Sequence, residues 1–349
     1  MKSPKVYAWE EIKEDFKKKL VLGNGASIAV WDGFKYDSLY DKAADSKIFN
    51  PRLKRLFQEF KTRDFELVLK QLRQAAIVNQ LLGVKETKTQ ALYDLLRDAL
   101  VKTVSSTHPE QRDIQPCLLR IASFMSQFDT LLSLNYDLIV YWAMLRGNTL
   151  FGQQFKDGFI DDGMFRDDYE TLYPPYGQAK KTTMVFYPHG NLILATIVDL
   201  DRFGTEIKLI RPDEQAVLRH SIIETWEKGN VVPLFVSEGD TDTKLKAIKR
   251  SSYLQVAYSE LESKCETVVL YGFSLGDDDE HILRALMKSQ PERMAISIHV
   301  AGGDVEAKCE EVEHKVRKVC IKLNKELNKN VSPKINFFNA QSPGCWNNK

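Results

Sequence analysis

The sequence lacks the features of several common protein classes. No stretch approaches the roughly 18 consecutive apolar residues of a membrane-spanning helix. Residues 1–5 lead into a polar segment that has no signal-peptide apolar core. There is no internal repeat and no low-complexity linker. These absences predict a cytoplasmic globular protein that does not bind membranes, and 349 residues are enough for a large hydrophobic core.

Paired cysteines and a charge excess are also missing. The cysteines are scattered without any CxxC pair, as Cys117, Cys265, Cys309, Cys320 and Cys345. This pattern is typical of reduced thiols in a cytosol and excludes a cysteine-rich zinc site, and we expect no bound metal. With 49 basic and 48 acidic residues, the net charge of +1 also predicts no direct nucleic-acid binding.

An apolar run near the N-terminus ends at two glycines, with the sequence LVLGNGAS at residues 20–27. Glycine tolerates the dihedral angles of a sharp turn and lets a ligand approach the backbone. Backbone N–H groups at the start of a following helix suit a phosphate. The pattern predicts a strand, a turn and a helix that bind a diphosphate. A tight turn that binds no ligand has the same sequence pattern.

A helical block follows this first unit. An aromatic loop with Phe34 and Tyr36 comes first, and it either packs on the surface or covers a bound ligand. From about residue 51 to 128 apolar residues recur at helical spacing, and strand-like runs are missing. We interpret this block as a helical insertion after the first βα unit.

Strand-like runs then return, separated by helical segments. They lie at residues 130–134, 184–187, 231–236, 267–271, 294–300 and 334–338. The alternation predicts an α/β fold with a Rossmann-like, doubly wound, mostly parallel sheet, and the last strand could lie at its edge. We expect one catalytic domain over residues 1–349, with the insertion at about 40–128 and a C-terminal helix and strand at about 304–349.

Polar residues and glycines follow several of these strands. Asn135 and Asp137 follow one strand, His189 stands between proline and glycine after the next, and Gly272 and Ser274 follow a later one. Carboxyl ends of parallel strands are where open α/β sheets bind ligands. We therefore expect these residues to share one crevice with residues 23–27. Other histidines lack this context: His220, His299 and His314 are expected to be structural or exposed, whereas His108 and His281 stay undecided.

Taken in order, these motifs resemble the sirtuin-like superfamily. GNGAS at residues 23–27 resembles its Gly-Ala-Gly-x-Ser NAD turn, and LNYD at 134–137 resembles its Thr-x-Asn-x-Asp motif. His189 with Gly190 matches the catalytic His-Gly pair, and GFSL at 272–275 resembles the Gly-Thr-Ser-Leu element. The zinc module of protein-deacylating sirtuins is absent. This departure and the early helical insertion resemble the sirtuin-like NAD hydrolases of bacterial anti-phage defence.

The resemblance implies an enzyme whose substrate is NAD+. It would cleave the bond to nicotinamide, release ADP-ribose and deplete cellular NAD in abortive infection. It also implies an activating partner, either a HerA-type ATPase or a nucleotide-sensing subunit, and a homo- or hetero-oligomer. Two alternatives stay open, namely an NAD-dependent protein deacylase and a non-catalytic subunit that binds NAD or ADP-ribose.

The resemblance also implies roles for individual residues. Asn135 and His189 would be catalytic, Asn135 by hydrogen-bonding the nicotinamide ribose or the water and His189 as the general base. Residues 23–27 would hold the diphosphate, Asp137 the carboxamide, and Gly272 with Ser274 the adenosine ribose or its phosphate. The full predicted NAD-binding set is Gly23, Asn24, Gly25, Ala26, Ser27, Phe34, Tyr36, Asp137, Gly272 and Ser274.

Overall fold

The computed structural model describes most of the chain: residues 4–35, 39–45, 49–63, 65–85, 87–160, 162–166, 168–199, 204–210, 218–227, 231–236, 240–301, 303–328 and 330–348. An eight-stranded sheet forms its centre, in the order β1-β11-β10-β9-β2-β3-β5-β4. Neighbouring strands pair in parallel throughout this sheet. The strands are β1 (Val6–Tyr7), β2 (Lys19–Leu22), β3 (Thr130–Ser133), β4 (Phe155–Lys156), β5 (Thr183–Phe186), β9 (Thr267–Tyr271), β10 (Arg293–Ile298) and β11 (Lys334–Asn339).

The strand order defines a doubly wound sheet. From β2 the chain proceeds outward to β3 and then β5 on one side, and later from β9 to β10 and β11 on the other. Read along the sheet, β5-β3-β2-β9-β10-β11 is the order 3-2-1-4-5-6 of dinucleotide-binding α/β proteins. This order confirms the predicted fold class. The side on which successive strands are added changes between β2 and β9, which is the switch point of the sheet.

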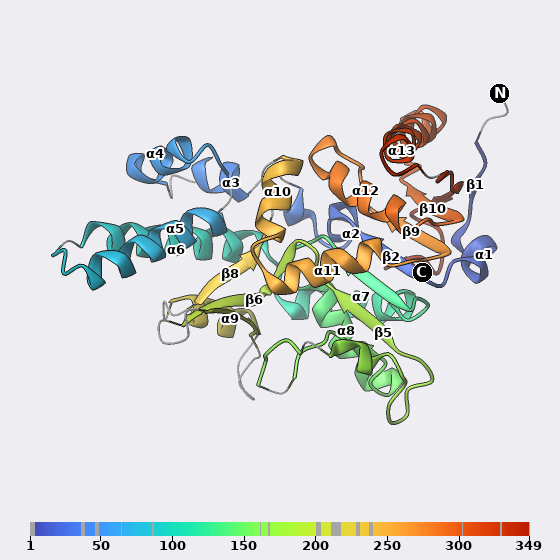
Figure 1. Ribbon diagram of the computed structural model, residues 1–349. Coiled ribbons are helices and arrows are strands. Elements are labelled where there is room, and N and C mark those ends of the chain that lie inside the picture. The colour runs from blue at the N-terminus through green and yellow to red at the C-terminus, as the bar shows by residue number, and fades with distance from the viewer. Residues whose placement is uncertain are drawn as a thin grey trace.

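Helices cover this sheet (Figure 1). Helices α7 (Gln111–Met125) and α8 (Ile139–Phe151) pack on each other, and α12 (Glu280–Lys288) packs between α11 (Ser252–Glu262) and α13 (Val305–Leu327). Because helices cover the sheet, β2, β3 and β5 are buried along their whole length, which explains their apolar runs. Among the described residues, no helix is long and apolar enough to cross a membrane.

The predicted helical insertion is confirmed between β2 and β3. After the short helices α1 (Trp9–Ile12) and α2 (Asn24–Ile28), it contains α3 (Leu39–Asp45), α4 (Pro51–Glu59), α5 (Phe65–Leu81), α6 (Lys88–Thr107) and α7. Asn50 caps α4, because its side chain accepts a hydrogen bond from the Leu53 N–H at 2.9 Å, and Pro51 occupies the first turn. In Figure 1, α5 and α6 form a long hairpin that projects away from the sheet.

Two strand predictions were wrong in their pairing. Residues 231–236 were expected within the parallel sheet, but β8 (Val231–Phe235) pairs antiparallel with β6 (Gly190–Asp199), which also pairs with β7 (Gly204–Leu209). These strands form a separate three-stranded sheet beside α9 (Leu218–Glu227). The last strand, β11, does not lie at the edge either, because β1 pairs with its outer side. Strand composition alone does not specify the partner of a strand.

Two glycine turns meet where the strand order reverses. The N–H of Gly23 donates to the Tyr271 carbonyl at 3.0 Å, and the N–H of Gly25 donates to the Gly272 carbonyl at 2.8 Å. A Cβ atom on Gly272 would lie 2.2 Å from the Ala26 nitrogen, and the Gly272 backbone has a φ of +63°. The turns after β2 and β9 therefore approach each other so closely that a side chain does not fit at Gly272.

This contact predicts a difference between two glycines of similar backbone conformation. Gly83 has a φ of +66°, but a Cβ atom there has no neighbour within 4 Å. Gly83→Ala should lower the free energy of unfolding by about 1–2 kcal/mol from backbone strain alone. Gly272→Ala adds a steric clash with the Ala26 backbone and should lower the free energy of unfolding by about 3 kcal/mol or more. Urea unfolding of both variants measures the difference, and equal losses would contradict the close contact.

Candidate functional site

A cavity of about 900 Å³ opens at the carboxyl ends of β2, β3, β5, β9 and β10. It therefore spans the point where the strand order reverses, which is the usual ligand site of open α/β sheets. The structure brings nine predicted residues to its wall: Gly23, Asn24, Gly25, Phe34, Asn135, Asp137, His189, Gly272 and Ser274. The sheet order thus assembles segments that lie far apart in the sequence.

Two further predicted residues do not line the cavity. Ala26 and Ser27 are buried in α2 behind the cavity wall. Tyr36 lies outside the described residues. Phe34 ends the short helix η2 (Asp32–Phe34), is only 3% exposed and packs edge-on against His108 at 5.4 Å between ring centroids. Its ring is thus part of the packed wall, which argues against a mobile cover over the ligand.

Ser27 connects the two polar residues that follow β3. Its hydroxyl donates to the Asp137 carboxylate and accepts a hydrogen bond from the Asn135 amide nitrogen at 2.8 Å. The same nitrogen donates to the Gly23 carbonyl at 3.0 Å. Asn135 is thereby held against the glycine turn, with its amide hydrogens already used inside the protein.

Asn191 supports this arrangement from β6. Its buried amide nitrogen donates to the backbone carbonyl of Asp137 at 2.6 Å and to that of Asn135 at 3.3 Å. The Asp137 carboxylate also accepts from the Ile139 N–H at 2.9 Å. Burial raises the pKa of Asp137, whereas the hydrogen bond from Ser27 opposes the rise. The network fixes the loop between β3 and α8 as one rigid part of the wall.

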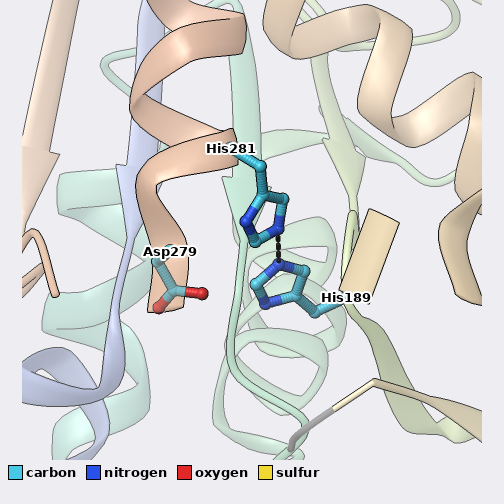
Figure 2. Close-up of side chains that lie close together, drawn as sticks. All are labelled: His189, Asp279 and His281. Atoms are coloured by element: carbon cyan, nitrogen blue, oxygen red, sulfur yellow. Dashed lines mark hydrogen bonds between the residues drawn. The ribbon is translucent and has the colours of Figure 1, made fainter. Parts of the chain in front are cut away.

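His189 forms an imidazole pair that the sequence did not reveal. It follows β5, and its Nε2 lies 2.9 Å from Nε2 of His281 in the first turn of α12, as Figure 2 shows. The two rings are stacked, with centroids 5.2 Å apart. Burial lowers the pKa of His189 to about 3 and that of His281 to about 4. Both rings are therefore neutral at physiological pH, and burial makes each a weaker base than a free imidazole.

An ion pair lies beside these histidines. Asp279, in the short helix η4 (Asp277–Asp279), accepts a hydrogen bond from Nζ of Lys244 at 2.7 Å. Lys244 comes from α10 (Thr241–Ile248), and its side chain is 8% exposed. Burial raises the pKa of Asp279, but the nearby His189 and Lys244 lower it by more, so the carboxylate is ionised.

His189, His281 and Asp279 could in principle hold a metal. One ligand atom of each lies within 4.8 Å of the others, and two imidazoles with a carboxylate suit several divalent transition metals. However, the carboxylate of this set is already ion-paired with Lys244. Its charge is therefore balanced by the protein itself, and a cation would have to compete with the Lys244 ammonium group.

Sequence reasoning missed several residues of the cavity wall. Asp279, and His281 behind the wall, had a signal, since an acidic turn and a histidine directly follow the GFSLG run. Lys244 had no such signal. Another group of missed residues comes from the carboxyl ends of β10 and β11 and from the C-terminal segment: Ser297, His299, Ala340, Gln341, Asn347 and Asn348. His299 was expected to be structural or exposed, and the structure also places it in the wall.

The other undecided histidine is structural. Nε2 of His108 accepts the Leu138 N–H at 2.9 Å, and its ring packs against Trp142 at 5.2 Å between centroids. His108 is buried and connects the end of α6 to the start of α8. It therefore supports the segment that carries Asn135 without being part of the cavity wall.

The fold and the cavity together define a doubly wound α/β protein with a cavity at its switch point. Residues 20–346 match the family described as Domain of unknown function (DUF4917), and the chain belongs to this family. No curated protein matches the sequence.

The chain is also similar to solved structures of Sir2 proteins. One comes from a study of the structural basis for the mechanism and regulation of Sir2 enzymes; it is 13% identical with a TM-score of 0.33, over 91% of this chain and 97% of that chain. Two mutants of a Sir2 homologue in complex with ADP-ribose are 12% identical, with TM-scores of 0.34 and 0.32. They cover 93% and 92% of this chain and 98% and 97% of theirs. At this level of similarity, function has to be inferred from the strand order and the cavity residues.

The two lowered histidine pKa values predict acid sensitivity. Below pH 6.5 the unfolded chain binds protons at these histidines that the folded chain binds only near pH 4 and pH 3. Folding stability should therefore fall as the pH falls through this window, by up to about 1.4 kcal/mol per pH unit for each histidine. Urea unfolding at pH 7 and pH 5 measures the loss. The double variant His189→Asn with His281→Asn should lose less than the wild type, and an equal loss would contradict the prediction.

Proposed function

We propose that the protein is an NAD+ glycohydrolase, which cleaves the N-glycosidic bond of NAD+ to give nicotinamide and ADP-ribose. One observation carries the proposal: the cavity lies at the switch point of a sheet in the 3-2-1-4-5-6 order, between two glycine turns, and it is lined by Asn135 and His189. Dinucleotides bind across this crevice in sheets of that order. The sirtuin-like motifs supply the same residues in the same order along the chain.

The cavity has room for both halves of a dinucleotide along the sheet edge. Towards β10 and β11 its wall holds Ser297 and Gln341, which suit the adenosine half. Towards β3 and β5 it holds Asn135 and His189, which suit the nicotinamide ribose. The diphosphate would then lie over the glycine turns, where the absence of side chains lets it approach the backbone.

The structure changes which groups would hold the diphosphate. The N–H groups of Gly23 and Gly25 already donate to carbonyls of the β9 turn, and the Ser27 hydroxyl donates to Asp137. Asn24 and Ser274 are exposed in the cavity wall and are better placed for that contact. Ser27 serves instead to hold Asn135 and Asp137 in place.

The chemistry needs a water molecule, a base and a protected cationic centre. As the bond breaks, its electron pair leaves with nicotinamide, and the ribose carbon becomes oxocarbenium-like. Water then forms the new C–O bond and loses a proton. His189 would accept this proton beside the Asp279 carboxylate, which raises the histidine pKa against the effect of burial, and Asn135 has an amide oxygen with which to orient the water or a ribose hydroxyl.

We also propose a cellular role on the basis of the motif resemblance. The chain would deplete NAD during phage infection after activation by a partner, either a HerA-type ATPase or a nucleotide-sensing subunit, within a homo- or hetero-oligomer. The rival activities use the same cavity. A protein deacylase would consume NAD+ only with an acyl-lysine peptide, and a binding subunit would hold NAD or ADP-ribose without releasing nicotinamide.

The proposal predicts that purified protein releases nicotinamide from NAD+, alone or with the product of a neighbouring gene. His189→Ala and Asn135→Ala should each reduce kcat by about a hundred- to ten-thousandfold, the usual contribution of positioned proton transfer and orientation. His314→Ala is the matched control, because His314 is exposed on α13. Both site variants should still bind NAD+ by calorimetry.

Each alternative has its own outcome in this assay. Near-wild-type hydrolysis by both site variants would remove them from the reaction. Nicotinamide release that requires an acetylated peptide would identify a deacylase. Binding of NAD+ without release, with every neighbouring gene product present, would identify a non-catalytic subunit.

A further inference from the structure

His281 contacts the proposed base without reaching the cavity. It is 1% exposed, and the cavity wall includes His189, Asp279 and Lys244 but not His281. Its closest polar contact is the Nε2 atom of His189 at 2.9 Å (Figure 2). A residue in this position can influence a bound ligand only through its neighbours.

The distance between the two rings requires one shared hydrogen. Two nitrogen atoms at 2.9 Å form a hydrogen bond in which one ring donates and the other accepts. A neutral imidazole has one N–H and one lone pair, so His189 keeps a free lone pair, on Nδ1, only when its Nε2–H donates to Nε2 of His281. Removing His281 would leave that tautomer, and the ring orientation, without this support.

One neighbouring group favours a positive charge on the histidine pair, although burial disfavours it. The Asp279 carboxylate raises the pKa of both histidines, whereas the Lys244 ammonium lowers it. Lys244 also holds Asp279 in place through their hydrogen bond at 2.7 Å. From α11, the neutral Tyr258 ring stacks on His281 at 6.2 Å between centroids, and its hydroxyl donates to the His281 backbone carbonyl at 3.0 Å. Asp279 is thus the anion that faces the pair.

We propose that His281 is a positioning residue for His189, and that Asp279 stabilises the charge that the histidine pair gains on accepting a proton. The inference rests on the proposed NAD+ hydrolysis. When the water oxygen bonds to the ribose carbon, one O–H bond breaks and its proton goes to the pair. The positive charge is then shared by two rings beside the ionised carboxylate, and not carried by one buried ring.

The experiment compares three variants in NAD+ hydrolysis. His281→Phe removes the nitrogen atoms but keeps an aromatic ring, and it should lower kcat by about a hundredfold while changing KM little. Asp279→Asn should lower kcat and move the acid limb of its pH profile to lower pH, because the pair loses its counter-charge. Tyr258→Phe is the matched control, since it removes only a contact to the His281 backbone; its kcat and pH profile should match the wild type.

Nitrogen NMR of the histidine rings tests the pairing without relying on activity. In the wild type, His189 should show one fixed tautomer, which His281→Phe disturbs and Tyr258→Phe preserves. If the wild type does not hydrolyse NAD+ with every neighbouring gene product present but shows this behaviour, the proposed function fails and the pairing stands. If it hydrolyses NAD+ and His281→Phe changes neither kcat nor the tautomer, the positioning role fails alone.

A metal site is the competing explanation, and it has a separate result. Zn²⁺ titrated into the wild-type protein should not bind in a one-to-one ratio by calorimetry, because Lys244 already balances Asp279. One-to-one binding that His281→Phe abolishes, together with hydrolysis that a chelator stops, would overturn the proton-sharing pair.

Discussion

The candidate site depends on the close approach of two backbone turns. The turns after β2 and β9 hydrogen-bond to each other through Gly23, Gly25 and Gly272, at distances that leave no space for a side chain on Gly272. These strands are the neighbours at which the sheet reverses its order. The glycines therefore serve the protein's own packing before they serve any ligand, and the floor of the cavity is backbone because nothing larger fits there.

The polar groups around this floor are organised in two independent units. One unit fixes the loop after β3, where Ser27 and Asn191 use their hydrogen bonds to hold Asn135 and Asp137. The other surrounds His189 and contains His281, Asp279 and Lys244. In each unit the side chains hold one another through these contacts, so the geometry that faces the cavity is established before a ligand arrives. Such preorganisation is what electrostatic catalysis requires.

The sequence was most informative where a local pattern determines the structure. Unbroken apolar runs predicted β2, β3, β5 and β9, and helical spacing predicted the insertion, because burial on both faces and helical periodicity leave direct traces in composition. Strand pairing left no such trace, so the antiparallel partner of β8 and the inner position of β11 were missed.

The same distinction holds for the candidate site. Residues at strand ends, such as Asn135 and His189, could be placed at the cavity because parallel strands end at one edge. The contact of His189 with His281 could not be predicted, because it depends on how α12 packs against the sheet. Nor could the roles of Gly23, Gly25 and Ser27 as internal donors, which depend on what lies next to them in space.

The cavity can form completely only late in synthesis, because the C-terminal segment is part of its wall. Trp346 donates to the Ala26 carbonyl at 2.8 Å and Asn347 donates to the Ala29 carbonyl at 3.0 Å, so residues near the end of the sequence close the wall beside the first glycine turn. A ribosome makes the glycine turn long before these residues, since Trp346 lies 320 positions after Ala26. A nascent chain therefore cannot complete the cavity until residue 348 has been added, and a truncated chain presents an open one. If the cavity consumes a metabolite that the translating cell needs, this arrangement delays the first turnover until the segment that closes the wall has been made.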